Sequence, residues 1–147
     1  MKKWLLAIPM IILLVSACSP IEDTKNTLTY INESTGYVDK ANQFANEIPS
    51  LAQEAVTDKQ AAQELETKLK DFQESIQNFN ELEAPGMMQD LHDQIVAQND
   101  KLENGISLYL ENIENGKLNK EVLENNELLQ SIQEIQSIYK QIQELGE

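Results

Sequence analysis

The chain has 147 residues with 25 acidic side chains, 11 lysines and no arginine, which gives a formal net charge of −14. An acidic surface without arginine argues against nucleic acid as a partner, because phosphate recognition relies on clustered cations and especially on arginine. The same charge repels anionic lipid headgroups, so any attachment to a membrane must rest on something other than basic side chains.

The N-terminus has the features of a secretory signal in the expected order. Lys2 and Lys3 precede an apolar run over residues 4–14, and small residues follow up to Ala17, directly before Cys18. A membrane-spanning helix needs about 20 apolar residues, so the shorter run is typical of a signal peptide. The pattern predicts a lipobox, with cleavage between Ala17 and Cys18 and a lipid on the cysteine thiol. The alternative is an ordinary signal with an incidental cysteine, but the one cysteine of the chain falls where lipidation requires it.

These features divide the chain into a signal peptide over residues 1–17, a lipidated tether over residues 18–24 and a bundle domain over residues 25–147. Once Cys18 is acylated no thiol remains for a disulfide, so the domain must be stable through packing alone. Two acyl chains, at about 0.8 kcal/mol per buried CH₂, anchor a protein stably. We therefore expect a lipoprotein held on the extracytoplasmic face of the cell membrane.

Apolar residues then recur in alternating steps of three and four along four segments, a pattern typical of near-parallel helices packed in a bundle. The pattern is weakest in the first segment, where it starts at Leu28. No segment alternates polar and apolar residues for long enough to predict a strand. The second segment carries Ala62, Leu65, Leu69, Phe72, Ile76 and Phe79, the third Met88, Leu91, Ile95, Leu102, Ile106 and Tyr109, and the fourth Leu128, Ile132, Ile135, Tyr139 and Ile142.

The boundary between the first two helices is marked by a helix-breaking residue and a helix-starting pair. Pro49 is expected to end the first helix, because proline lacks the N–H of a helical hydrogen bond and clashes with the preceding turn. Thr57 with Gln60 forms a capping box, which predicts the start of the long second helix.

Similar signals separate the remaining helices. Residues 83–86, Glu-Ala-Pro-Gly, divide the second helix from the third, Asn115-Gly116 supplies a left-handed stop, and Asn119 is expected to cap the last helix. Because the connections are short, neighbouring helices should run antiparallel. The sequence therefore predicts an all-α fold, an antiparallel up-down four-helix bundle.

The one histidine of the chain, His92, does not predict a metal site. Its neighbours Asp90 and Asp93 project from other faces of the helix, and Ile95 and Val96 occupy the downstream positions where a second ligand would lie. We expect instead a surface or seam-edge imidazole that is hydrogen-bonded locally. No phosphate loop, calcium loop or nucleophile elbow occurs, so we predict no enzyme, no catalytic residues, no metal and no cofactor.

Three aromatic residues of the first helix, Tyr30, Tyr37 and Phe44, recur every seven residues beside its apolar seam. The favoured interpretation is that they fill the core, and the alternative is an interaction face offered to a partner helix or ligand. Gly36 lies in mid-helix at a cost of about 1 kcal/mol relative to alanine, which suggests close packing or a kink. Asn99 falls on the seam of the third helix, where a buried amide can fix the register of packing.

The lipobox and several short patterns around the third helix resemble small lipoproteins of unknown function from Bacillus-type Gram-positive bacteria. These patterns are Pro85-Gly86-Met87-Met88, Leu91-His92-Asp93, Leu102, Gly105-Ile106 and Tyr109. The resemblance implies lipidation at Cys18 and a Gram-positive cell surface, and it offers no active site to transfer.

Two functional hypotheses remain. The favoured one is a non-catalytic interaction or accessory module, anchored to the membrane by its lipid, that presents a face of the bundle to an envelope or membrane protein. The alternative is a carrier of a small apolar ligand between its helices, for which a narrow bundle leaves little volume.

Overall fold

The computed structural model describes residues 20–146 of the chain, with side chains from Lys25 onward. The predicted cleavage site at Ala17 and Cys18, and with it the lipidation site, lies outside the described residues. The long helices are α1 (Pro20–Ala55), α2 (Lys59–Asn80), α3 (Gln89–Glu111) and α4 (Glu127–Gly146). The shorter elements are the 3-10 helix η1 (Gly86–Met88), the strands β1 (Ile113–Glu114) and β2 (Lys117–Leu118), and the 3-10 helix η2 (Lys120–Glu124).

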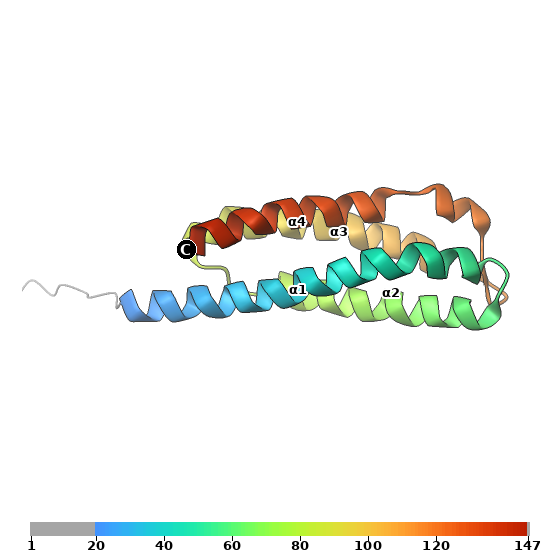
Figure 1. Cartoon of the computed structure of the whole chain (residues 1–147), viewed down its shortest axis with the longest axis horizontal. Coiled ribbons are helices and arrows are strands. Elements are labelled where there is room, and N and C mark those ends of the chain that lie inside the picture. Colours follow the sequence, from blue (N-terminus) through green and yellow to red (C-terminus); the bar gives the residue numbers. More distant parts are fainter. Residues whose placement is uncertain (1–19, 147) are drawn as a thin grey trace, which may run out of the picture.

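The four long helices run alternately up and down around one core (Figure 1). Helix α1 packs against α2 and α4, and α3 packs against the same two helices. The apolar seams predicted for α2, α3 and α4 are buried along most of their length, whereas Leu28, where the weaker seam of α1 begins, is 55% exposed. The predicted fold class, an antiparallel up-down four-helix bundle, is confirmed.

Helix α1 is longer at both ends than the sequence suggests. It begins at Pro20, so residues 20–24, which the sequence assigns to a tether, are helical. The prediction that Pro49 ends this helix is wrong, because α1 continues through it to Ala55. The lost hydrogen bond and the steric clash at a proline cost about 3 kcal/mol, but Ala52 and Ala55 in the following turns are fully buried. Packing therefore outweighs the local preference of the proline.

Two of the predicted helix caps differ from the structure, one by a single residue and one by a whole element. Asp58, rather than Thr57, caps α2, and its Oδ1 accepts a hydrogen bond from the Ala61 backbone N–H at 2.8 Å. Asn119 caps η2 instead of the last helix, because η2 intervenes and buries Val122 before α4 begins. Local capping motifs identify a helix start without identifying which helix follows.

The left-handed stop at Asn115 and Gly116 is confirmed, with φ values of 54° and 75°. These two residues turn the chain between β1 and β2, where Ile113 pairs with Leu118 in antiparallel register. Leu118 is buried, so the turn returns an apolar side chain to the core. The strands are two residues each and too short to produce a period-two pattern in the sequence.

Buried polar pairs connect α1 to α3 across the core. The Tyr37 hydroxyl donates to Asn99 Oδ1, and Asn99 Nδ2 donates to Asn80 Oδ1 of α2 at 2.6 Å. One heptad earlier on both helices, the Tyr30 hydroxyl lies 3.1 Å from His92 Nδ1, so the two pairs share the same offset of 62 residues. The register role suggested for Asn99 fits this arrangement, because sliding α3 along α1 would break both pairs.

Replacing either of two helical glycines by alanine should change the stability of the bundle in opposite directions. A Cβ at Gly105 would lie 2.8 Å from Cγ of buried Leu128, whereas a Cβ at Gly36 would meet nothing within 4 Å. We expect Gly105→Ala to lower the free energy of unfolding by about 1 kcal/mol, because overpacking costs roughly 1–3 kcal/mol and improved helix propensity returns up to about 1.

The matched control is Gly36→Ala, which should raise the free energy of unfolding by about 0.5–1 kcal/mol. Chemical denaturation of the mature protein, followed by circular dichroism, measures both changes. A Gly105→Ala variant as stable as Gly36→Ala would contradict the close α3–α4 packing.

Candidate functional site

The three aromatic residues proposed as an interaction face lie in the core. Tyr30, Tyr37 and Phe44 are 2%, 5% and 6% exposed. The favoured interpretation of the pattern, core packing, therefore holds, and the alternative of an exposed aromatic face is corrected. Most of each ring is covered by α2 and α3, since residues seven apart point to the same side of a helix and this side faces inward.

The rings form a stacked series between α1 and α2. Phe44 stacks on Phe72 with ring centroids 4.3 Å apart, and Tyr37 stacks on Phe79 at 4.5 Å and lies parallel to Phe72 at 6.1 Å. Phe79 also stacks on His92 at 5.0 Å, which extends the series to α3. Such aromatic pairs stabilise a fold by about 0.5–1.5 kcal/mol beyond the burial of their area. The seven-residue spacing of Phe72 and Phe79 on α2 matches that of the α1 rings and is the sequence signal for this pairing.

The outer edges of these rings line a groove that follows the line where α1 meets α2. It consists of three hollows of about 400, 240 and 300 Å³. The first lies over Phe44 and Phe72, the second over Tyr37 and Phe79, and the third beside Tyr30. Lys40, Ser75 and Asn78 line both the first and second hollows, and Glu33 lines both the second and third, so the hollows adjoin. We call this feature the α1–α2 groove.

The walls of the α1–α2 groove carry five carboxylates and two lysines. They are Glu33, Lys40 and Glu47 on α1, Lys68, Asp71 and Glu74 on α2, and Glu83 just after α2. The groove therefore combines an aromatic floor with walls that are negative in balance. Sequence reasoning missed it because these wall residues look like ordinary solvated helix faces.

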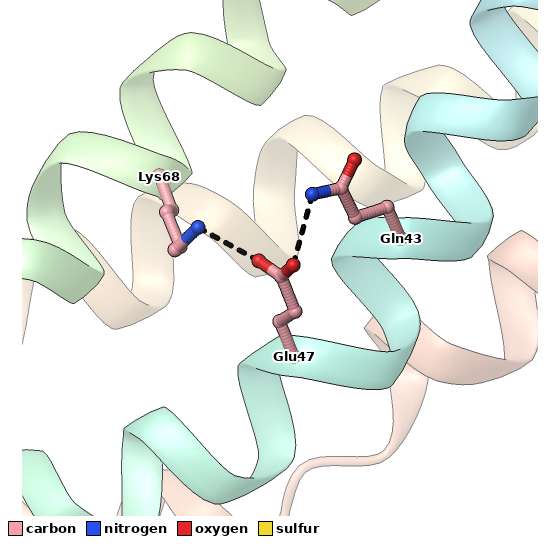
Figure 2. Close-up of polar contacts among 3 residues, drawn as sticks. All are labelled: Gln43, Glu47 and Lys68. Atoms are coloured by element: carbon pink, nitrogen blue, oxygen red, sulfur yellow. Dashed lines mark hydrogen bonds and ion pairs between the residues drawn. The ribbon is translucent and has the colours of Figure 1, made fainter.

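One ion pair bridges the groove in its first hollow. Lys68 Nζ of α2 donates to Glu47 Oε2 of α1 at 2.7 Å, and Gln43 Nε2 donates to Glu47 Oε1 at 2.9 Å (Figure 2). Hydrogen bonding between the two partners lowers the pKa of Glu47 and raises the pKa of Lys68. Both side chains are more than a third exposed, 34% for Lys68 and 39% for Glu47. Because both side chains are exposed, the pair contributes little to stability and is accessible to a ligand.

Gly36 lies in the second hollow, together with Tyr37 and Phe79. It is exposed, α1 runs uninterrupted through it, and no neighbouring atom occupies the space a Cβ would take. The expectation of close packing at this glycine is therefore wrong, and α1 continues as a helix through it. Its consequence is open space beside α1 at the second hollow, above two rings that are themselves almost fully buried.

The interpretation of His92 as a surface or seam-edge residue with local hydrogen bonds is wrong. The imidazole is 4% exposed, and its partner Tyr30 lies on another helix, 62 residues away in sequence. Burial lowers the pKa of His92 and raises the pKa of Tyr30 to about 12. Both side chains are therefore neutral near pH 7 and form a structural hydrogen bond behind the third hollow.

A smaller crevice of about 190 Å³ lies at the opposite end of the bundle from the third hollow. Its apolar lining comes from Phe44, Ile48, Pro49, Ala52, Tyr109, Leu123, Leu128 and Leu129. Small-molecule sites usually measure about 300–1,000 Å³, so this crevice offers less space than the apolar-ligand carrier hypothesis requires.

Within residues 20–146, no three His, Cys, Asp or Glu side chains are grouped as a metal ion would require. None of the helices in that range combines the length and the apolar character needed to cross a bilayer.

Comparison with known proteins places the chain among lipoproteins of unknown function. Residues 30–145 match a family of unknown function, DUF6376. The chain is 34% identical over 136 residues to "Uncharacterized lipoprotein YybP" of Bacillus subtilis (strain 168), covering 92% of each protein. No solved structure matches it. The resemblance to Bacillus-type lipoproteins is thereby confirmed.

The buried His92 predicts a loss of stability on mild acidification. Its pKa is lowered in the folded state, so below about pH 6.5 the unfolded chain takes up a proton that the folded chain does not. The stabilisation is fully present above that pH and falls as the pH drops, by at most about 1.4 kcal/mol per pH unit.

We expect the free energy of unfolding to decline more steeply between about pH 7 and 5.5 in the wild type than in His92→Gln. Glutamine can still bond to Tyr30 but does not titrate, and the surface carboxylates are common to both proteins. Denaturant unfolding at a series of pH values measures the difference, and parallel profiles would exclude a buried neutral imidazole.

Proposed function

This chain belongs to the DUF6376 family of unknown function, and on that premise we propose that it is a lipid-anchored cell-surface lipoprotein whose α1–α2 groove binds a helical segment of an envelope or membrane protein. The lipobox before Cys18 and the lipoprotein name of the Bacillus subtilis relative support the anchor. The anchor would hold the bundle on the extracytoplasmic face of the membrane.

The mid-helix glycine is the observation that carries the binding role. Gly36 costs the isolated helix about 1 kcal/mol relative to alanine, and no atom of the described chain uses the space it leaves. Glycine is the residue that allows another backbone to approach closely. A partner helix that crosses α1 at Gly36 would enter the second hollow, whose exposed lining includes Glu33, Lys40 and Asn78.

The dimensions of the groove suit a helix better than a small molecule. It extends along α1 from Tyr30 to Glu47, which at about 1.5 Å per residue is about 26 Å. That length accommodates about five turns of a partner helix. The hollows are open along the bundle rather than enclosed, as in groove-binding proteins that receive one amphipathic helix.

Charge restricts the partner further. The groove walls have five carboxylates against two lysines, and the whole chain has a net charge of −14. A segment with apolar side chains on one face and lysine or arginine beside them would match the aromatic floor and the acidic walls. Complementary charge would also increase the rate of encounter.

We propose binding rather than catalysis because the groove groups are already engaged or solvated. Ser75 donates its hydroxyl hydrogen bond to the Asp71 carbonyl oxygen at 3.1 Å, and Glu47 is paired with Lys68. Among the described residues, the imidazole that would serve as a base is His92, which is buried behind Tyr30. A nucleophile beside a base, as covalent catalysis requires, is not assembled along the groove.

The anchor is tested at the predicted lipidation site. Cys18→Ala removes the thiol that accepts the lipid, so it should abolish incorporation of a labelled fatty-acid analogue and block lipoprotein-type cleavage after Ala17. Cys18→Ser is the conservative control and should behave in the same way, since lipid attachment needs sulfur. Undiminished label in either variant would refute a lipid on Cys18.

The groove is tested by filling the opening at Gly36. Gly36→Leu adds a side chain at the second hollow, and its Cβ meets no other atom within 4 Å. We expect the variant to be at least as stable as the wild type, because leucine has the better helix propensity, and to lose partner recovery about tenfold, which corresponds to about 1.4 kcal/mol of binding free energy.

The matched control is Ala97→Leu, which adds leucine at an exposed position of α3 outside the groove. Mature lipoprotein is captured from detergent-solubilised membranes, and stoichiometric partners are quantified for all three proteins. Equal recovery with Gly36→Leu and wild type would exclude the groove as the binding site.

A further inference from the structure

The described chain exposes three large apolar side chains, and all three lie at one end of the bundle. They are Leu28 of α1, Met87 of η1 and Leu145 of α4, which are 55%, 62% and 44% exposed. Figure 1 shows that the end of α4, the connection between α2 and α3, and the projecting part of α1 share this end. We call these three residues the apolar tip.

Neighbouring contacts show that the three elements meet there. A Cβ built on Gly146, the residue after Leu145, would lie 2.2 Å from Ile31 Cδ1 and 3.7 Å from Met88 Cε. Ile31 is one turn after Leu28, and Met88 directly follows Met87. The exposed side chains therefore surround a junction of three elements instead of being scattered singly over the surface, where they would need no explanation.

The apolar tip is also the end nearest the proposed lipid. Helix α1 starts at Pro20, two residues after Cys18 in the sequence. From Pro20 to Leu28 the helix rises about 12 Å at 1.5 Å per residue. The headgroup layer on each side of a bilayer is roughly 5–8 Å thick. The tip therefore lies within reach of the membrane when α1 leans away from the membrane normal.

We propose that the apolar tip inserts into the interfacial layer of the membrane that holds Cys18, so that the bundle docks by this end with α1 inclined. This inference rests on the lipid anchor of the proposed function. The exposed charges next to these residues in the sequence are Lys25 against Glu83, Asp90 and Glu144, so this end is negative in balance and anionic headgroups would not attract it. The contact is consequently apolar and needs no anionic lipid.

Contact of the apolar tip with lipid can be tested by tryptophan fluorescence. Trp4 is the one tryptophan of the full chain, and it lies within the predicted signal peptide, so the mature lipoprotein has none. Met87→Trp places a reporter at the apolar tip, and Lys120→Trp places a matched reporter on exposed η2 at the far end. Both lipidated proteins are reconstituted in phosphatidylcholine vesicles with and without brominated acyl chains, which quench tryptophan on contact.

Interfacial apolar side chains lie about 5–10 Å deep, at the headgroup–acyl boundary, so we expect brominated lipid to reduce Met87→Trp emission about twofold and to leave Lys120→Trp nearly unchanged. Adding Leu28→Gln and Leu145→Gln to Met87→Trp should abolish most of the quenching without unfolding the bundle, since both positions are exposed.

The possible failures are distinguishable by flotation of the vesicles. If both proteins float with the vesicles and the two reporters respond alike, the tip proposal is overturned while the anchor stands; the tip is then free to contact a protein instead of lipid. If the proteins remain in the soluble fraction, the anchor fails, and the tip proposal fails with it.

Discussion

Helices α1 and α2 are held together by stacked rings, with Phe44 against Phe72 at 4.3 Å and Tyr37 against Phe79 at 4.5 Å. These rings are almost fully buried and stabilise the bundle, and they lie beneath the α1–α2 groove as its floor. The same interaction therefore determines both the packing of the first two helices and the shape of the surface beside them. A change that removed the rings for a binding experiment would also damage the fold.

Buried polar groups then fix how the rings are positioned along the bundle. Tyr30 with His92 and Tyr37 with Asn99 link α1 to α3 at the same offset of 62 residues. Leaving one such group without a partner in the core costs about 1–3 kcal/mol, so a slip of either helix is strongly disfavoured. These pairs account for the one histidine of the chain in structural terms. Because Phe79 stacks on His92, these pairs also fix the position of the Phe79 ring beneath the groove.

The proposed membrane contact and the proposed partner binding use different surfaces of the bundle. The apolar tip lies at the end of the bundle nearest Cys18, whereas the α1–α2 groove runs along its side. Contact of the tip with the membrane would leave the groove open toward neighbouring proteins in the same membrane. A strongly acidic body would remain separated from anionic headgroups and would favour basic segments as partners.

Most of the architecture was determined by local pattern. The seam from Leu65 to Phe79, the break at residues 83–86 and the left-handed turn at Asn115 each reflect backbone or periodicity preferences that act within a few residues, so the sequence alone predicted an antiparallel four-helix bundle. Lipidation at Cys18 likewise follows from a contiguous motif, and it stays a prediction because that residue lies outside the described structure.

The continuation of α1 through Pro49 was decided by burial of Ala52 and Ala55 against distant residues. The burial of His92 depended on Tyr30 and Phe79, which no local window contains. The groove itself required α1 and α2 to be placed side by side, because a hollow is the space left between helices after packing and no single helix carries a signal for it.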